Sequence, residues 1–277
     1  MPRYKLTIEY NGAPYAGWQK QDDFPTVQSN IEEALFKFCG EKIGVVGAGR
    51  TDSGVHATAQ IAHIDLPRET DPFKIMQGIN FYLFNTITPV SHEMAAQDLC
   101  ADGSCAPMQS IGHRIKKNHI AILDAQPVSD DFHARFSAKK RHYLYRITNR
   151  RARLALDAGK VWHVVEPLDI ENMQRAADTL LGYRDFTSFR DTQCQAKSPM
   201  KTLEQLDITR HGEEIHIITS ARSFLHHQVR IMVGTLALVG KGRWQVADMH
   251  AALIARDRTK AGPTAPPDGL YLTKVDY

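Results

Sequence analysis

The sequence contains 277 residues, of which 43% are hydrophobic and 23% charged, with a formal net charge of +3 and a mean hydropathy of -0.36. A chain of this length can bury a substantial core, as one large domain or as two small ones. An apolar run that could span a bilayer is absent, and the four cysteines do not suggest a disulfide framework. We therefore expect a cytoplasmic protein with reduced thiols, no signal peptide and no membrane anchor.

The first half of the chain has the pattern of a β-α-β-β-α-β unit. Residues 4–10 alternate apolar and polar side chains, as a half-buried strand does. Thr26 can cap a helix with one apolar face, and Asp71-Pro72 can open a second helix. The expected strands and helices, in chain order, lie at 4–10, 26–38, 43–46, 61–66, 71–84 and 120–123.

The second half repeats this order. Expected strands lie at 141–147, 203–209, 214–219 and 270–275, and expected helices at 169–181, 227–239 and 246–255. Gly182 is expected to end the first of these helices, and Gly240 with Gly242 the second. The pattern predicts an α+β fold of two tandem ferredoxin-like halves, 1–135 and 136–277. They would share one mainly antiparallel sheet, with a catalytic cleft between them.

Asp52 lies in the most informative segment, residues 47–57 (GAGRTDSGVHA). Glycines on both sides let the backbone adopt a positive φ and let a partner approach closely. Arg50 favours the ionised carboxylate that a nucleophile or an electrostatic stabiliser requires. The same residues also fit an ordinary turn with a surface ion pair worth under about 1 kcal/mol, so the residues alone leave both interpretations open.

A basic stripe at residues 138–160 holds eight Lys or Arg and a single acid, Asp157. Such a stripe fits a polyanionic partner, although a solvated charged face explains it equally well. His142, Tyr143 and Tyr145 lie among the cations. Rings that can stack favour nucleic acid over a membrane or an acidic protein.

Several segments resemble motifs of the tRNA pseudouridine synthase A family. Residues 47–57 resemble its catalytic motif, residues 136–145 (FSAKKRHYLY) its second motif, and residues 224–230 (FLHHQVR) its third. Residues 15–21 (YAGWQKQ) and 261–270 (AGPTAPPDGL) are also similar, and the resemblance covers essentially the whole chain. The motif around Asp52 is long and specific, so the resemblance favours its catalytic interpretation.

The resemblance implies an isomerase that converts uridines of the tRNA anticodon stem-loop, at tRNA positions 38, 39 and 40, to pseudouridine without a cofactor. The target base must leave the helix, because an in-helix uridine hides the reacting atoms. Asp52 would be the nucleophile, Tyr143 would stack on the flipped uracil, and Arg230 would pair with the carboxylate. Arg50 would tune Asp52 or contact the RNA. Members of the family are homodimers, so tRNA and a second copy of the chain are the expected partners.

Further RNA contacts are expected from cations near Tyr143, namely Arg135, Lys139, Lys140 and Arg141. His226 and His227 invite a metal interpretation. Adjacent residues on a helix point about 100° apart, whereas metal-binding pairs usually occur at i and i+4. We therefore predict that these two histidines are structural or face the RNA, and that no metal is bound.

The one departure from the family pattern is an insertion at residues 96–117. It contains Cys100 and Cys105, which could bind a metal or form a redox pair, and a basic end around residues 113–117. A structural zinc site needs about four ligands, and only His92 or His113 is nearby. We predict a variable surface loop.

Two other functions compete with the synthase. A non-catalytic RNA-binding protein or tRNA chaperone could use the same scaffold, because fold does not imply function. A carboxylate-based glycosidase would need a second acid about 5–10 Å away, and the sequence pairs none with Asp52. The sequence also leaves open whether Asp52 attacks ribose C1′ or base C6, and which tRNAs are modified.

Overall fold

A computed structural model describes residues 1–85 and 118–277, so the predicted surface loop at 96–117 lies outside the described residues. The strands are β1 (Arg3–Tyr10), β2 (Val46–Gly47), β3 (His56–Asp65), β4 (Ile120–Val128), β5 (Lys140–Asn149), β6 (Trp162–Val164), β7 (Gly182–Asp185), β8 (Met200–His211), β9 (Glu214–Ala221) and β10 (Leu270–Asp276). The α-helices are α1 (Val27–Cys39), α2 (Pro72–Asn85), α3 (Ile170–Asp178), α4 (Gln228–Gly240) and α5 (Val246–Ala255).

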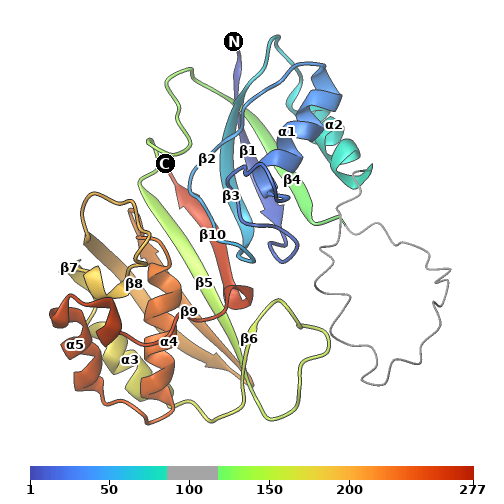
Figure 1. Cartoon of the computed structure of the whole chain (residues 1–277). Coiled ribbons are helices and arrows are strands. Elements are labelled where there is room, and N and C mark those ends of the chain that lie inside the picture. The colour runs from blue at the N-terminus through green and yellow to red at the C-terminus, as the bar shows by residue number, and fades with distance from the viewer. Residues whose placement is uncertain (86–117) are drawn as a thin grey trace.

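The strands form one open 10-stranded sheet with the order β4-β1-β3-β10-β5-β9-β8-β7, while β2 pairs with β3 and β6 with β5 (Figure 1). All pairs are antiparallel except β3 with β10 and β5 with β6. The prediction of a mixed α and β protein with a mainly antiparallel sheet is therefore confirmed.

The last strand, β10, occupies the middle of the sheet and joins the two halves of the chain. It lies between β3 of the first half and β5 of the second. Leu270 packs in the hydrophobic core of the C-terminal half, whereas Leu272 packs in that of the N-terminal half. Tyr143, opposite Leu272 on β5, packs against both cores. Residues at the centre of this sheet can therefore come from both halves of the sequence.

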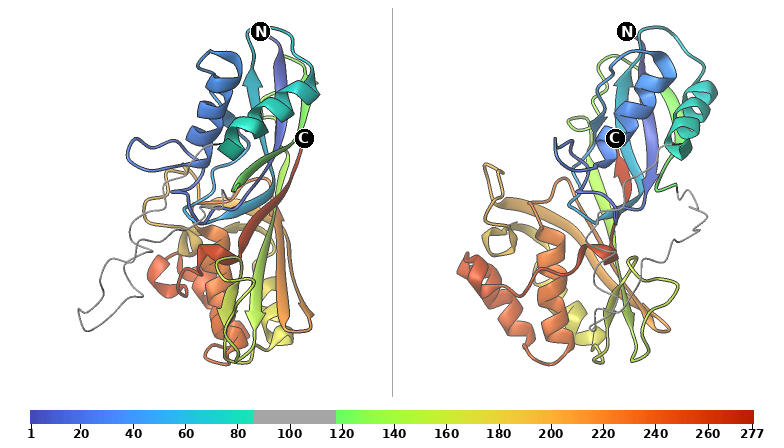
Figure 2. Two further views of the ribbon diagram at one scale, coloured as in Figure 1. Left: turned by 90° about the vertical axis from the view of Figure 1, so that its right-hand side faces the viewer. Right: turned by 45° about the vertical axis from the view of Figure 1, so that its right-hand side comes forward.

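The helices cover the sheet and bury the apolar faces that the sequence predicts. Thr26 caps α1 as expected, since its side chain accepts a hydrogen bond from the backbone N–H of Ser29, and Val27, Ile31 and Leu35 are fully buried. The edge-on view in Figure 2 shows α1, α4 and α5 on the same side of the sheet. In residues 1–85 and 118–277, every helix is too short or too polar to cross a bilayer.

Several predicted boundaries were wrong. The strands expected at 61–66 and 120–123 are the longer β3 (His56–Asp65) and β4 (Ile120–Val128). The helix expected to run to residue 181 ends at Asp178, because the backbone N–H groups of residues 179–181 donate to carbonyls three residues earlier rather than four. Gly182 instead starts β7 in a left-handed conformation, with φ of 89°. The strand expected at 43–46 is only the two-residue β2, and the helix expected from residue 227 begins at Gln228. Strands β6 and β7 were not predicted.

Candidate active site

The turn that carries Asp52 lies between β2 and β3 and is fixed by the segment that follows β1. The backbone N–H of Trp18 donates to the carbonyl of Thr51 (3.1 Å), and that of Gly54 donates to the carbonyl of Tyr15 (3.3 Å). Gly54 has φ of 78°, a backbone conformation that residues other than glycine rarely adopt. The backbone on both sides of Asp52 is thus held in place before any substrate binds.

Gly12 supports this turn through a close backbone contact that gives a testable consequence. A Cβ atom at Gly12 would lie 2.0 Å from the carbonyl oxygen of Val55, whereas a Cβ atom at Gly44 would meet no atom within 4 Å. We expect Gly12→Ala to lower the free energy of unfolding by about 1–3 kcal/mol or more. Gly44→Ala, the matched control, should change it by under about 0.5 kcal/mol. Urea denaturation of both variants tests this, and equal stabilities would contradict it.

Arg230 reaches the turn from the first turn of α4 and is oriented by the C-terminal segment at 261–270. Its Nε donates to the carbonyl of Ala265 (2.8 Å), and the N–H of Ala265 donates back to the carbonyl of Arg230 (3.0 Å). The same segment contacts the turn, because a Cβ atom at Gly54 would lie 2.8 Å from Pro267. The segment therefore fixes Arg230 and the Asp52 turn relative to each other.

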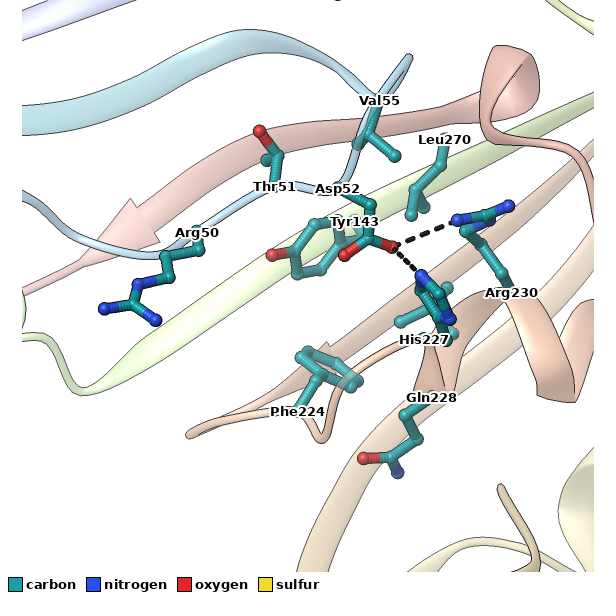
Figure 3. Close-up of a pocket in the computed structure, with 11 residues that line it drawn as sticks. Arg50, Thr51, Asp52, Val55, Tyr143, Phe224, His227, Gln228, Arg230 and Leu270 are labelled. Carbon is teal, nitrogen blue, oxygen red and sulfur yellow. Dashed lines mark hydrogen bonds and ion pairs between the residues drawn. The ribbon is translucent and has the colours of Figure 1, made fainter. Parts of the chain in front are cut away.

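Three cationic or titratable side chains surround the Asp52 carboxylate. Arg230 Nη1 lies 3.2 Å from Oδ2 and His227 Nε2 lies 3.4 Å from the same oxygen, as Figure 3 shows. His226 Nε2 lies 3.6 Å from Oδ1. The Asp52 side chain is 21% exposed and that of Arg230 is 13% exposed, so this ion pair is partly shielded from water. The arrangement holds one carboxylate beside an arginine and two histidines at a partly exposed position.

Arg50 lines the same pocket but does not serve as the charge partner of Asp52 in this structure. Its exposed side chain points away from the carboxylate in Figure 3. The partner is Arg230, which lies 178 residues further along the chain. Of the two roles expected for Arg50, tuning of Asp52 has no support from the geometry, and contact with the RNA stays a prediction.

Tyr143 forms one wall of the pocket next to Asp52. It lies on β5 between Leu272 and Thr219 of the neighbouring strands, and its ring meets Phe224 edge-on with centroids 5.3 Å apart. The cavity between these side chains measures about 40 Å³, far below the roughly 300–1,000 Å³ of typical ligand pockets. A base can therefore enter only if lining side chains move. Tyr145, two residues on, is fully buried in the core and cannot stack on RNA in this structure.

The environment of Tyr143 predicts that the free energy of unfolding decreases at alkaline pH. Burial, with a smaller contribution from the Asp52 charge, raises the pKa of Tyr143 to about 12. This folded-state pKa exceeds the ordinary value near 10, so the unfolded chain loses the Tyr143 proton at lower pH than the folded protein. The free energy of unfolding is therefore unaffected by Tyr143 below about pH 10 and decreases as the pH rises toward 12. We expect Tyr143→Phe to reduce the loss of unfolding free energy between these pH values. Urea titrations at several pH values, with the exposed Tyr183→Phe as control, test this expectation.

The basic stripe at 138–160 is partly neutralised within the fold. Arg141 donates to the carbonyls of Ala48 (2.7 Å), Arg135 (2.8 Å) and Arg222 (2.6 Å), and burial lowers its pKa. Ion pairs within the protein join three more cations of the stripe to acids, namely Lys140 to Glu204, Arg146 to Glu214 and Arg150 to Glu213. The exposed cations of this region are Arg135, Lys139, Arg151, Arg153 and Lys160.

Sequence reasoning missed the proximity of His226 and His227 to Asp52. His227 is not helical but caps α4 in a left-handed conformation, with φ of 58° and ψ of 4°. As a result, the two adjacent rings lie face to face, with centroids 3.9 Å apart and planes inclined by 31°. The argument that helix geometry separates these side chains was therefore wrong. A left-handed conformation at a residue other than glycine leaves little signal in a sequence.

Comparison with known proteins extends this picture to the whole chain. A family described as tRNA pseudouridine synthase matches residues 176–277. Proteins named tRNA pseudouridine synthase A match all 277 residues. That of Rhodopseudomonas palustris (strain BisB18) is 53% identical over 100% of both chains. That of Nitrobacter winogradskyi is 52% identical over 100% of this chain and 96% of its own. The chain belongs to the tRNA pseudouridine synthase A family.

The matches to the tRNA pseudouridine synthase A family include all parts of the chain that contribute to the candidate site. The family match at 176–277 includes Arg230, His226 and His227, but it begins after Asp52 and Tyr143 in the sequence. The full-length relatives match the part of the chain that contains these two residues as well, for example the protein of Maricaulis maris, which is 50% identical over 100% of this chain and 98% of its own. The resemblance inferred from the motifs alone is therefore confirmed.

Proposed function

We propose that this protein is a tRNA pseudouridine synthase, an isomerase that acts on uridine in tRNA. The observation that carries the proposal is the pairing of Asp52 with Arg230 beside Tyr143, in a chain whose full-length relatives bear the name tRNA pseudouridine synthase A. The carboxylate, its partner and an aromatic wall come from different parts of the chain and meet in one pocket.

The chemistry that this site would perform is a rearrangement within one nucleotide. The N-glycosidic bond of uridine breaks, the uracil rotates, and a new bond forms between ribose C1′ and carbon 5 of the base. The hydrogen on carbon 5 leaves as a proton and N1 of the uracil gains a proton, so the product is an isomer of uridine and the reaction is redox-neutral. Asp52 supplies the nucleophile, toward either ribose C1′ or base C6. The fixed backbone around Asp52 holds this carboxylate in place without reorganisation.

The roles of the other residues follow from their positions. Tyr143 would stack on the flipped uracil, an interaction worth about 1–3 kcal/mol per base. Arg230 would pair with the carboxylate and orient it, and Arg50 would contact the RNA near the site where the base leaves the helix. The cations proposed to bind RNA phosphates are Arg135, Lys139, Lys140 and Arg141, of which Arg135 and Lys139 have exposed side chains.

Finer features belong to the same proposal. The target uridines would be those of the anticodon stem-loop, at tRNA positions 38, 39 and 40, and the enzyme would act as a cytoplasmic homodimer. The two tandem ferredoxin-like halves, 1–135 and 136–277, would each supply one side of the site. The element order β1-α1-β2-β3-α2-β4 of the first half supports this division.

Tritium release from tRNA transcripts that carry [5-³H]uridine tests the function directly. Pseudouridine formation must expel the hydrogen on carbon 5, so release follows the chemistry rather than binding. We expect release from unmodified tRNA without an added cofactor. Tight tRNA binding without release would refute the enzyme and support the alternative of an RNA-binding protein or tRNA chaperone.

Phosphate contacts can be tested through the salt dependence of tRNA affinity. Each lost contact should lower the magnitude of the slope of log affinity against log salt by about 0.7–0.9. We expect this decrease for Lys139→Ala and for Arg135→Ala. Lys37→Ala, on α1 and paired with Glu33, serves as the control and should leave the slope unchanged. Equal slopes for all three variants would contradict RNA contact by Arg135 and Lys139.

A further inference from the structure

Asp191, a second carboxylate near the site, has no part in the proposed reaction. It lies behind the two histidines, with Oδ2 2.8 Å from His227 Nδ1 and Oδ1 3.8 Å from His226 Nδ1. On the opposite edge of each ring, Nε2 faces Asp52, at 3.4 Å for His227 and 3.6 Å for His226. Both imidazoles therefore lie between two carboxylates, and in each ring Nδ1 faces Asp191 and Nε2 faces Asp52.

This orientation is the one that metal-binding histidines adopt. A carboxylate at Nδ1 holds the proton on that nitrogen and leaves the Nε2 lone pair free for a metal ion. Asp191 is itself fixed, because Oδ1 accepts a hydrogen bond from the N–H of Gln193 (2.8 Å). Its own N–H donates to the carbonyl of His226 (3.0 Å). The second carboxylate is thus built into the backbone around the histidines.

The distances between the possible ligand atoms suit a small tetrahedral ion. Asp52, His226 and His227 each offer one atom, and these atoms lie within 4.8 Å of one another. Zinc with bonds of about 2.0–2.1 Å needs ligand atoms about 3.3 Å apart. His227 Nε2 lies 3.4 Å from Oδ2 of Asp52 and His226 Nε2 lies 3.6 Å from Oδ1, so each imidazole is near that spacing from one oxygen of the carboxylate. The three side chains are 21–39% exposed, so an ion can reach them and water can supply a fourth ligand.

Arg230 opposes a cation here, but the local charge still favours one. Its Nη1 lies 3.2 Å from Asp52 Oδ2, whereas Oδ1 is the oxygen nearer His226. Asp52 and Asp191 together offer two carboxylates against the guanidinium of Arg230, and Arg50, which lines the same pocket, points away from Asp52. Imidazole and carboxylate ligands suit zinc and related transition metals, whereas magnesium prefers oxygen ligands.

We propose that Asp52, His226 and His227 form a zinc site in which Asp191 orients the two histidines. Because the ion would take the carboxylate that the chemistry needs, zinc and catalysis exclude each other, and bound zinc inhibits the enzyme. The inhibitory part of this inference rests on the proposed function, whereas the binding part does not.

Calorimetric titration of the full-length protein with Zn²⁺ tests binding, and Co²⁺ serves as a second probe because its visible absorption bands report on the ligands. We expect one site per chain and no heat of binding with Mg²⁺. Asp191→Ala should weaken Zn²⁺ binding by about 10- to 100-fold, and His226→Gln, which removes a ligand, by at least as much. His142→Gln removes a histidine that pairs with Asp276 (2.7 Å) rather than with Asp52 or Asp191, and should leave zinc affinity unchanged.

Absence of cobalt bands, or an equal loss of zinc affinity in His142→Gln, overturns the site. Tritium release in a zinc buffer then tests inhibition, which Asp191→Ala should shift to about 10- to 100-fold higher free zinc. Full release at zinc concentrations that saturate the site overturns the inhibitory role. Zinc binding by a protein that releases no tritium even without zinc overturns the proposed function and leaves the site intact.

Discussion

Asp52→Asn is expected to abolish tritium release while tRNA binding survives. The asparagine side chain keeps the volume of the aspartate and can still accept a hydrogen bond from Arg230, so the pocket should keep its shape. It cannot supply an anionic nucleophile, and loss of a nucleophile typically costs about 10,000-fold or more in turnover. We expect the tRNA dissociation constant to stay within about threefold, because phosphate contacts supply most of the affinity.

The control for this variant is Asp207→Asn, which neutralises an exposed carboxylate on β8. It should release tritium at the wild-type rate. Unfolding curves of both variants establish that each is folded at the assay temperature. Comparable release by Asp52→Asn and wild type would contradict the proposed nucleophile. A folded Asp52→Asn that lost tRNA binding would assign Asp52 to substrate recognition instead.

The order of elements could be predicted because it depends on local periodicity. Alternation at 4–10 gave β1, and the spacing of Val27, Ile31 and Leu35 gave α1, with its cap at Thr26. The boundaries that failed depend on interactions that periodicity does not encode. The end of α3, for example, is a tighter turn in which residues 179–181 bond to carbonyls three residues earlier.

The site could be predicted only in part, because its contacts are long-range. Sequence proximity suggested Arg50 as the charge partner of Asp52, yet the fold brings Arg230 to it from α4. The position of β10 between β3 and β5 explains why this happens. The final strand places the C-terminal segment beside both the Asp52 turn and Arg230. A motif can identify both residues, but only the sheet order shows how they meet.

Arg230→Met is expected to produce the second large loss of activity. Methionine retains part of the apolar stem but removes the hydrogen bonds to Asp52 and to the carbonyl of Ala265. Loss of one partner from a partly buried, hydrogen-bonded charge pair costs about 2–5 kcal/mol, or about 30- to 5,000-fold in kcat/KM. Initial rates of tritium release at several tRNA concentrations measure this change. Arg243→Met, in an exposed ion pair with Glu166, is the control and should stay near wild type.

Arg230→Lys separates charge from geometry at the same position. A lysine keeps the positive charge but cannot donate to Asp52 and Ala265 at once through a planar, forked group. If orientation of the carboxylate matters, Arg230→Lys should recover only part of the activity lost in Arg230→Met. Full recovery would mean that the charge alone suffices and that the C-terminal segment does not orient the site. No difference between Arg230→Met and wild type would remove Arg230 from the proposed mechanism, and His226 and His227 would then be the remaining side chains that contact the Asp52 carboxylate.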